Sequence, residues 1–146
     1  MKSSSRTIKP WHRGHHWTST PDTCPTLLSA NEAQWAGFDP AFRVSLPYWA
    51  LTGLLTAGLK VRAGAETAPW LRQPAFTLRL YPPGCPFWED AEPAAEPLRS
   101  VWLDFTGGER IGLERFLDRT RGYATFEDPE GLLLRQIQSM AHSAAS

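Results

Sequence analysis

Residues 76 to 90 read FTLRLYPPGCPFWED, a strand pattern followed directly by a turn pattern. Its first half alternates in hydropathy, so Leu78 and Leu80 share one face of an expected β-strand. The prolines and glycine behind it fit a type II turn, because Pro83 presets φ at the second position and Gly84 accepts a positive φ at the third. The stretch therefore predicts a strand that reverses at a tight turn.

Further short apolar segments, punctuated by proline and glycine, lie on both sides of this turn. YWALTGLLT (residues 48–56) is almost continuously apolar, as is typical of a strand buried on both faces. LKVRAG alternates and places Leu59 and Val61 inside. Short strands at this spacing favour a sandwich or a barrel. We therefore expect a β-barrel unit over residues 26–108.

Upstream of the barrel segments the sequence is less regular. TLLSA (residues 26–30) predicts a short strand, and NEAQWAGFDP (residues 31–40) a surface connection. Residues 1–25 are polar, dotted with proline and without a helical or strand period, which predicts a partly disordered N-terminal arm.

The last part of the chain, residues 109–146, changes to a helical period and predicts two α-helices. The second begins at Asp128, whose carboxylate can accept hydrogen bonds from the free N–H groups of the first turn. Leu133, Ile137 and Met140 then recur along one face of that helix. This stripe can pack on the barrel of its own chain or on the same stripe of a partner in a two-fold dimer.

Composition excludes several classes of function. Fifteen basic and fifteen acidic residues cancel, whereas a domain that neutralises many phosphates usually has a basic excess. The longest apolar stretch, YWALTGLLTAGL, is too short to span a bilayer, and the basic N-terminus has no apolar segment behind it. We therefore expect a cytoplasmic chain that does not enter membranes, with Cys24 and Cys85 as reduced thiols.

The four histidines lie away from the expected barrel strands of residues 42–105. A metal site in such a barrel needs imidazoles that project from its strands. HRGHH could bind a metal alone, but it has no neighbouring carboxylate or cysteine. The histidines concerned are His12, His15, His16 and His142.

Other catalytic signatures are absent from the sequence. It has no G-x-S-x-G elbow, phosphate-binding loop or dinucleotide fingerprint. Glu89, Asp90 and Glu92 follow the turn and are most simply read as solvated charges. We therefore expect no metal, no cofactor and no catalytic step.

The ordered segments YWALTGLLTAGLKVRAG, LRLYPPGCPF, WLDFTG and DPEGLLL together resemble the N-terminal domain of AraC-type transcription regulators. The resemblance implies a cupin-like jelly-roll barrel that binds a small effector, followed by two α-helices that form a homodimer. It also implies a downstream helix-turn-helix domain, absent from this chain, through which alone DNA would be bound. The alternative is a small cupin-type enzyme or a stand-alone small-molecule-binding protein.

Aromatic residues are the candidate ligand contacts. Phe87 and Trp88 follow the turn at the expected barrel mouth, where they either line a pocket or plug the barrel end. Trp49 leads an interior strand and can offer a stacking face. Trp17 lies in the arm, which in arabinose-responsive members of the family folds over the ligand. Phe87 replaces a histidine common in the family, and Gln73-Pro74-Ala75 replaces a common Gly-Asp pair. Both changes remove polar groups, which leaves open an apolar or aromatic effector or no effector.

Arginines could instead bind an anionic effector if they turned inward. Arg43, Arg62 and Arg79 lie in the expected strands, and the alternation predicts surface positions for Arg62 and Arg79.

Overall fold

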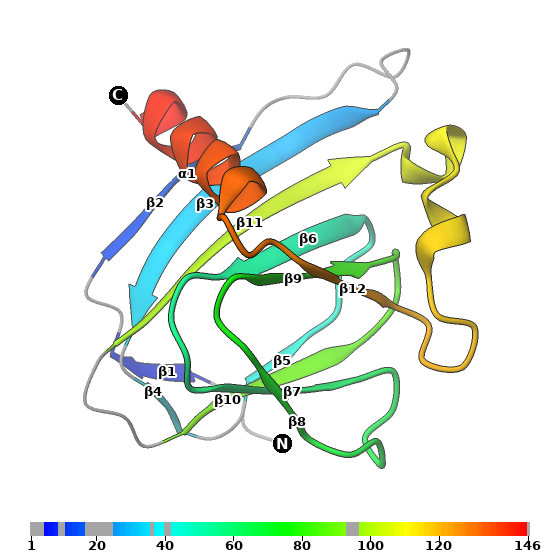
Figure 1. Cartoon of the computed structure of the whole chain (residues 1–146), viewed down its shortest axis with the longest axis horizontal. Helices are drawn as coiled ribbons and strands as arrows, with labels where there is room; N and C mark the ends of the chain where they lie inside the picture. Colours follow the sequence, from blue (N-terminus) through cyan, green and yellow to red (C-terminus); the bar gives the residue numbers. More distant parts are fainter. Residues whose placement is uncertain are drawn as a thin grey trace.

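The computed structural model describes residues 5–8, 11–16, 25–35, 37–39, 42–92 and 97–145. Within them the chain is mainly β-structure, with one α-helix at the C-terminal end (Figure 1). The strands are β1 (Ser5–Ile8), β2 (Trp11–His16), β3 (Thr26–Trp35), β4 (Gly37–Asp39), β5 (Phe42–Val44), β6 (Trp49–Leu54), β7 (Leu59–Ala63), β8 (Leu71–Gln73), β9 (Thr77–Tyr81), β10 (Phe87–Ala91), β11 (Leu98–Thr106) and β12 (Ala124–Glu127). The helical elements are the 3-10 turns η1 (Gly108–Ile111) and η2 (Leu113–Phe116) and the helix α1 (Leu132–Ala145).

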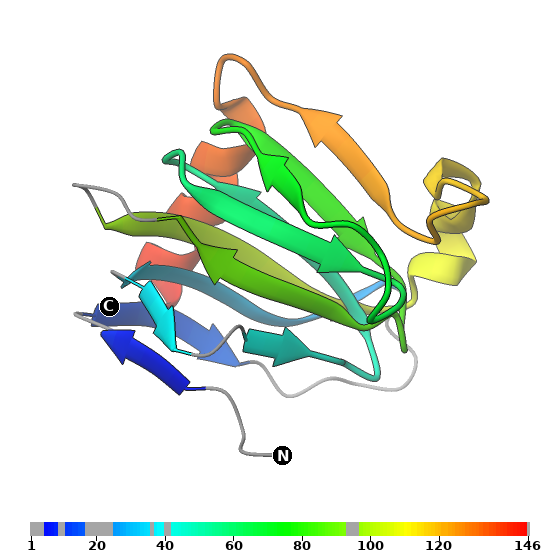
Figure 2. The same cartoon turned by 90° about the horizontal axis from the view of Figure 1, so that it is seen from below.

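Two antiparallel sheets form the body of the molecule. One has six strands in the order β12-β9-β6-β11-β3-β2, and the other has four in the order β5-β10-β7-β8. Figure 2 shows the two sheets facing each other, with α1 behind the six-stranded sheet. This is the arrangement of a jelly-roll barrel, so the predicted fold class is confirmed.

The interior of the barrel is built from alternate residues of both sheets. Leu54 and Tyr81 from the larger sheet pack against Leu59, Val61 and Phe87 from the smaller one. Because successive strand residues point to opposite faces, the residues between them face outward. On the larger sheet these outward residues are also apolar, since α1 covers that face.

Helix α1 lies across the outer face of the six-stranded sheet. Leu134 and Ile137, both almost fully buried, pack on Leu78 and Val101. A Cβ at Gly53 would collide with the Leu134 side chain, so the glycine of β6 permits this close approach. The stripe predicted from the sequence thus packs on its own barrel at Ile137.

Asp128 caps α1 as the sequence predicts, but the helix begins at Leu132 rather than at Asp128, because Gly131 has a positive φ of 70°. The backbone N–H groups of Leu132 and Leu134 donate to the two Asp128 carboxylate oxygens, at 3.0 and 2.8 Å. These bonds satisfy donors that have no partner within the helix.

The prediction of a first α-helix after residue 109 is wrong. Its segment forms only the 3-10 turns η1 and η2, followed by β12. Gly112, with φ of 76°, separates the two turns, and its left-handed backbone interrupts an α-helix. One α-helix therefore follows the barrel.

The N-terminal segment differs from the expected arm where its backbone is described. β1 pairs with β4, and β2 joins the six-stranded sheet beside β3. The sequence of β2 shows no alternation of polar and apolar residues, because this strand lies at the edge of its sheet. None of the helices in the described ranges is long and apolar enough to cross a membrane.

The segment expected as a surface connection is also different. β3 continues without a break through residues 31–35, and Glu32 lies beneath α1 with no exposed surface. The Glu32 carboxylate accepts from Arg99 Nη2 at 2.9 Å and Gln138 Nε2 at 2.7 Å, and it also pairs with His142. A polar cluster therefore fixes the C-terminal half of α1 to the sheet.

Candidate functional site

A cavity of about 240 Å³ lies inside the barrel between the two sheets. Larger-sheet residues enter it from β6 and β11, and smaller-sheet residues from β5, β7, β8 and β10. Most of its wall is apolar, which is typical of a pocket for a small organic molecule. The lining residues include Ala50, Thr52, Leu59, Phe87, Glu89, Trp102 and Asp104.

Strand pairing explains how the wall is assembled. Thr52 on β6 is the direct partner of Trp102 on β11, and Ala50 is the partner of Asp104. Directly paired residues of an antiparallel sheet lie on the same face. Two rows of side chains from these strands therefore form one wall of the cavity.

The Asp104 carboxylate is the best-defined polar group of this wall. Asp104 is buried, and its Oδ2 accepts a 2.6 Å hydrogen bond from Ser29 Oγ on β3. Asn31 Nδ2 in turn donates to Ser29 Oγ at 3.0 Å. Burial raises the pKa of the Tyr48 phenol, and the Asp104 charge raises it further, so this phenol stays neutral.

The opposite wall contributes a second carboxylate. Glu89 on β10 pairs with Val61, a fully buried interior residue of β7. Glu89 therefore faces the cavity, whereas the sequence predicted a solvated acid. Asp90, the next residue, faces outward and lies 3.9 Å from Lys60.

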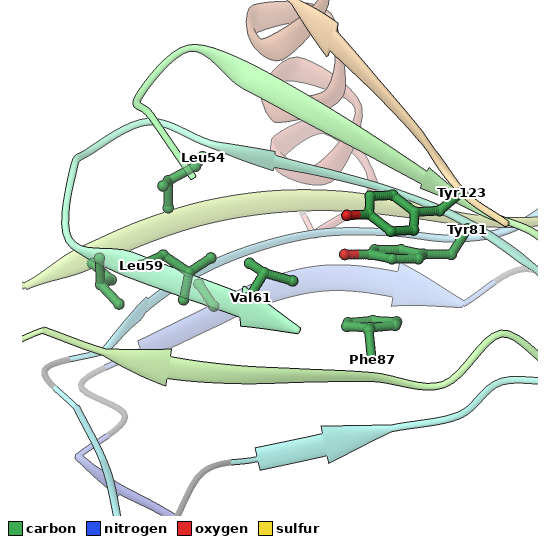
Figure 3. Packing of buried hydrophobic residues seen from close by; sticks show 8 residues of the cluster. Leu54, Leu59, Val61, Tyr81, Phe87 and Tyr123 are labelled. Carbon is green, nitrogen blue, oxygen red and sulfur yellow. The ribbon is translucent and has the colours of Figure 1, made fainter. Parts of the chain in front are cut away.

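Stacked aromatic rings close one side of the interior. Phe87 and Tyr81 stack nearly parallel, with centroids 4.0 Å apart, and Tyr123 lies 5.6 Å from Tyr81. Figure 3 shows the two tyrosine hydroxyls pointing the same way, toward the side where Leu54 and Val61 lie. Burial raises the pKa of Tyr81 and outweighs the opposing influence of Arg79, so the Tyr81 phenol stays neutral.

Arg79 is the largest departure from the expected strand phase. It is 4% exposed and shares the inward face of β9 with Tyr81, because Leu78 and Leu80 face outward into clusters under α1 and η2. Its guanidinium carbon lies 5.1 Å from the centroid of the Tyr123 ring. The predicted surface position of Arg79 is therefore wrong. Both faces of the sheet are covered, and the apolar residues Leu78 and Leu80 of β9 lie on the outer face, not in the barrel interior.

The predicted ligand residues fall in different places. Phe87 lines the cavity and also belongs to the interior aromatic stack. Trp88 is on the opposite face of β10, with the Arg43 guanidinium carbon 5.5 Å from its ring. Trp17 lies outside the described residues.

Trp49 packs outside the cavity. It is 2% exposed, lies against Gly108 and stacks on Phe105 at 6.3 Å. Its indole N–H donates to Glu109 Oε2 at 3.0 Å, and this hydrogen bond lowers the pKa of Glu109. The geometry makes Trp49 the anchor of η1 on the barrel.

The predicted dimer residues also separate. Ile137 is 1% exposed and packs on the sheet, while Leu133 and Met140 are 39% and 37% exposed on the flank of α1. Only these two remain on the surface for a partner.

Histidine positions bear on metal binding. The strand β2, which carries His12, His15 and His16, is part of the barrel sheet, contrary to the expectation that no barrel strand carries an imidazole. Their side chains lie outside the described part of the structure. The described side chains contain no cluster of three or more histidine, cysteine, aspartate or glutamate residues that could hold a metal ion.

Several cavity residues were not predicted. Thr52, Ser100, Trp102 and Asp104 are inward residues of β6 and β11, two strands whose outward residues are apolar and pack under α1. The available signal was polarity: within the apolar runs, Thr52 and Asp104 are the positions where polar residues interrupt the pattern.

No protein-family model and no curated protein sequence matches this chain. Several solved structures are similar to it. YhaK from Escherichia coli is similar over 82% of this chain and 52% of its own, with a TM-score of 0.57 and 12% sequence identity. The chain thus spans about half the length of YhaK.

Two further structures are similar. Bacterial pirin YhhW from Escherichia coli, in complex with nickel(II), has a TM-score of 0.48 and 13% identity over 81% of this chain and 52% of its own. Oxalate decarboxylase OxdC from Bacillus subtilis has a TM-score of 0.49 and 12% identity over 92% of this chain and 34% of its own. Oxalate decarboxylase is by its name an enzyme, and on this finding the prediction of no catalytic step is corrected. The comparisons support a cupin-like fold.

Proposed function

We propose that the chain is a small-molecule-binding protein whose ligand occupies the interior cavity. The observation that carries the proposal is the cavity itself, about 240 Å³ between the two sheets and walled mainly by apolar side chains. Binding sites of this kind combine an apolar wall with a few placed polar groups. Here Thr52, Glu89 and Asp104 supply such groups.

Trp102 provides a direct test, because it lines the cavity while Trp88 lies on the outer face. We expect benzyl alcohol, a small neutral aromatic probe, to change the tryptophan fluorescence of the wild-type chain. Trp102→Phe should abolish most of this change, and the matched control Trp88→Phe should retain it.

Loss of the signal in both variants, or in neither, would locate the probe elsewhere. Ala50→Leu, which narrows the cavity at one wall, should weaken binding of the same probe. Ala57→Leu, at an exposed turn, is its control.

A second candidate is the sensor and dimerisation unit of an AraC-type regulator, with DNA bound through a downstream domain. Its support within the chain is the exposed apolar surface of α1, formed by Leu132, Leu133 and Met140. The small-molecule-binding proposal needs no such output and rests on the cavity alone. Extending the reading frame past Ser146 and searching it for two helix-turn-helix patterns distinguishes the two.

A further inference from the structure

Arg79 carries a positive charge into the barrel without enough hydrogen-bond acceptors for it. The residue is 4% exposed, and its Nε and Nη1 atoms are buried with no hydrogen-bond partner among the described residues. A buried polar group left unsatisfied costs about 1–3 kcal/mol, and more when it is charged. Buried arginines are therefore normally matched by an acceptor.

The neighbours of Arg79 stabilise its charge, and the Tyr81 hydroxyl is one partner, but within the described residues they leave Nε and Nη1 without an acceptor. The Tyr123 ring lies 5.1 Å from the guanidinium carbon and offers a cation–π contact. The face of an aromatic ring does not saturate the N–H groups at the edge of a guanidinium. The planar edge is the part that binds a carboxylate with two parallel hydrogen bonds.

The position of Arg79 connects it with the cavity. Its direct partner on β6 is Thr52, which lines the cavity, and both lie on the inward face of the larger sheet. Neighbouring strands are about 4.8 Å apart, a distance that an arginine side chain spans. A molecule seated in the cavity that extends past Thr52 therefore meets the guanidinium.

We propose that Arg79 binds the carboxylate of a small monocarboxylic acid whose apolar body occupies the cavity. This inference rests on the proposed function and names the class of ligand. The body lies against Leu59, Phe87 and Trp102, which supply the apolar wall.

The acid is limited to one carboxylate by the other charges of the cavity. Glu89 and Asp104 are the acidic lining residues, on β10 and β11. A second carboxylate on the ligand would add a further negative charge beside these two in a site of low dielectric. The site is thus selective for molecules with an acidic head and a neutral body.

Three probes of similar shape test this inference on the wild-type chain by isothermal titration: benzoate, neutral benzyl alcohol, and terephthalate with an acid at each end. We expect benzoate to bind about tenfold or more tightly than benzyl alcohol, as one charge-assisted interaction allows. Terephthalate should bind more weakly than benzoate. Arg79→Met should remove the preference for benzoate while benzyl alcohol still binds, and Arg79→Lys should retain part of it.

Each outcome decides between the two proposals. Equal binding of benzoate and benzyl alcohol to the wild type overturns the role of Arg79 and leaves the cavity as a binding site. An undiminished benzoate preference in Arg79→Met does the same, and terephthalate binding as tight as that of benzoate overturns the restriction to one acid. If no probe binds the wild type, both proposals fail. The wild-type comparison holds even if Arg79→Met does not fold.

Discussion

Gln138 Nε2 on the C-terminal helix donates a 2.7 Å hydrogen bond to Glu32 Oε2 on β3, across 106 positions of the sequence. The Glu32 carboxylate is fully buried, and Arg99 and His142 complete its surroundings. A buried carboxylate is tolerated only where donors compensate its lost hydration. Helix α1 is therefore fixed to the barrel at two places, by apolar contacts near its start and by this polar cluster near its end.

Removing the Glu32 carboxylate should destabilise the chain through this second attachment. We expect Glu32→Ala to lower the free energy of unfolding by about 1–3 kcal/mol, because Gln138 loses its acceptor at a partly buried position. Urea unfolding monitored by circular dichroism measures the change. Glu130→Ala, an exposed acid just before α1, is the matched control and should be near neutral. Equal loss in both variants would show that the cluster does not hold the helix.

Stability should also fall in acid because of Glu32. Burial alone would raise its pKa, but hydrogen bonds from His142, Gln138 and Arg99 outweigh burial and lower it from its ordinary value of 4.5. A carboxyl whose folded pKa is lowered contributes stability above its unfolded pKa, and this contribution is lost as the pH falls through the folded value. Thermal melts of the wild type should therefore decline more steeply below about pH 4.5 than those of Glu32→Gln. Parallel declines would assign the acid sensitivity to other carboxyls.

The first attachment depends on a glycine. A Cβ at Gly53 would collide with the Leu134 side chain, and Gly53 has no positive φ that would add backbone strain. We expect Gly53→Ala to lower the free energy of unfolding by about 1–3 kcal/mol by overpacking. In the Leu134→Ala background the same substitution should cost much less, which a double-mutant cycle measures. Strict additivity would contradict the proposed collision.

The sequence pattern predicted the fold class and the place of Phe87 in the cavity, but not the other residues that line it. The strands around the Pro-Pro-Gly turn and the Asp128 cap follow from local chemistry, namely alternation, turn residues and free helix donors. Local chemistry does not determine which face of a strand points inward, because both faces of the six-stranded sheet are buried. Arg79 shows the consequence: its apolar neighbours Leu78 and Leu80 pack on the outer face.

Glu32 could not be placed for a related reason. Its partners Gln138 and His142 lie more than 100 positions away, so nothing in the local NEAQ sequence distinguishes it from a solvated acid. Gly112 was the local signal that the first expected helix would not form. This glycine lies between η1 and η2, and its left-handed backbone prevents a continuous helix in spite of the apolar period of the segment.

The outer flank of α1 gives the last prediction, on self-association. Leu133 and Met140 lie on the flank of α1, away from the buried Ile137. They expose apolar surface that the barrel does not cover. If this flank forms a homodimer, Leu133→Asp combined with Met140→Asp should yield a folded monomer by light scattering, because each charge would enter the interface twice. Ser139→Asp, at another exposed position of the helix, should leave the dimer intact. Ile137→Asp should instead unfold the chain by burying a charge beneath α1. A wild-type chain that is already monomeric at all concentrations would remove the helix from any role in dimerisation.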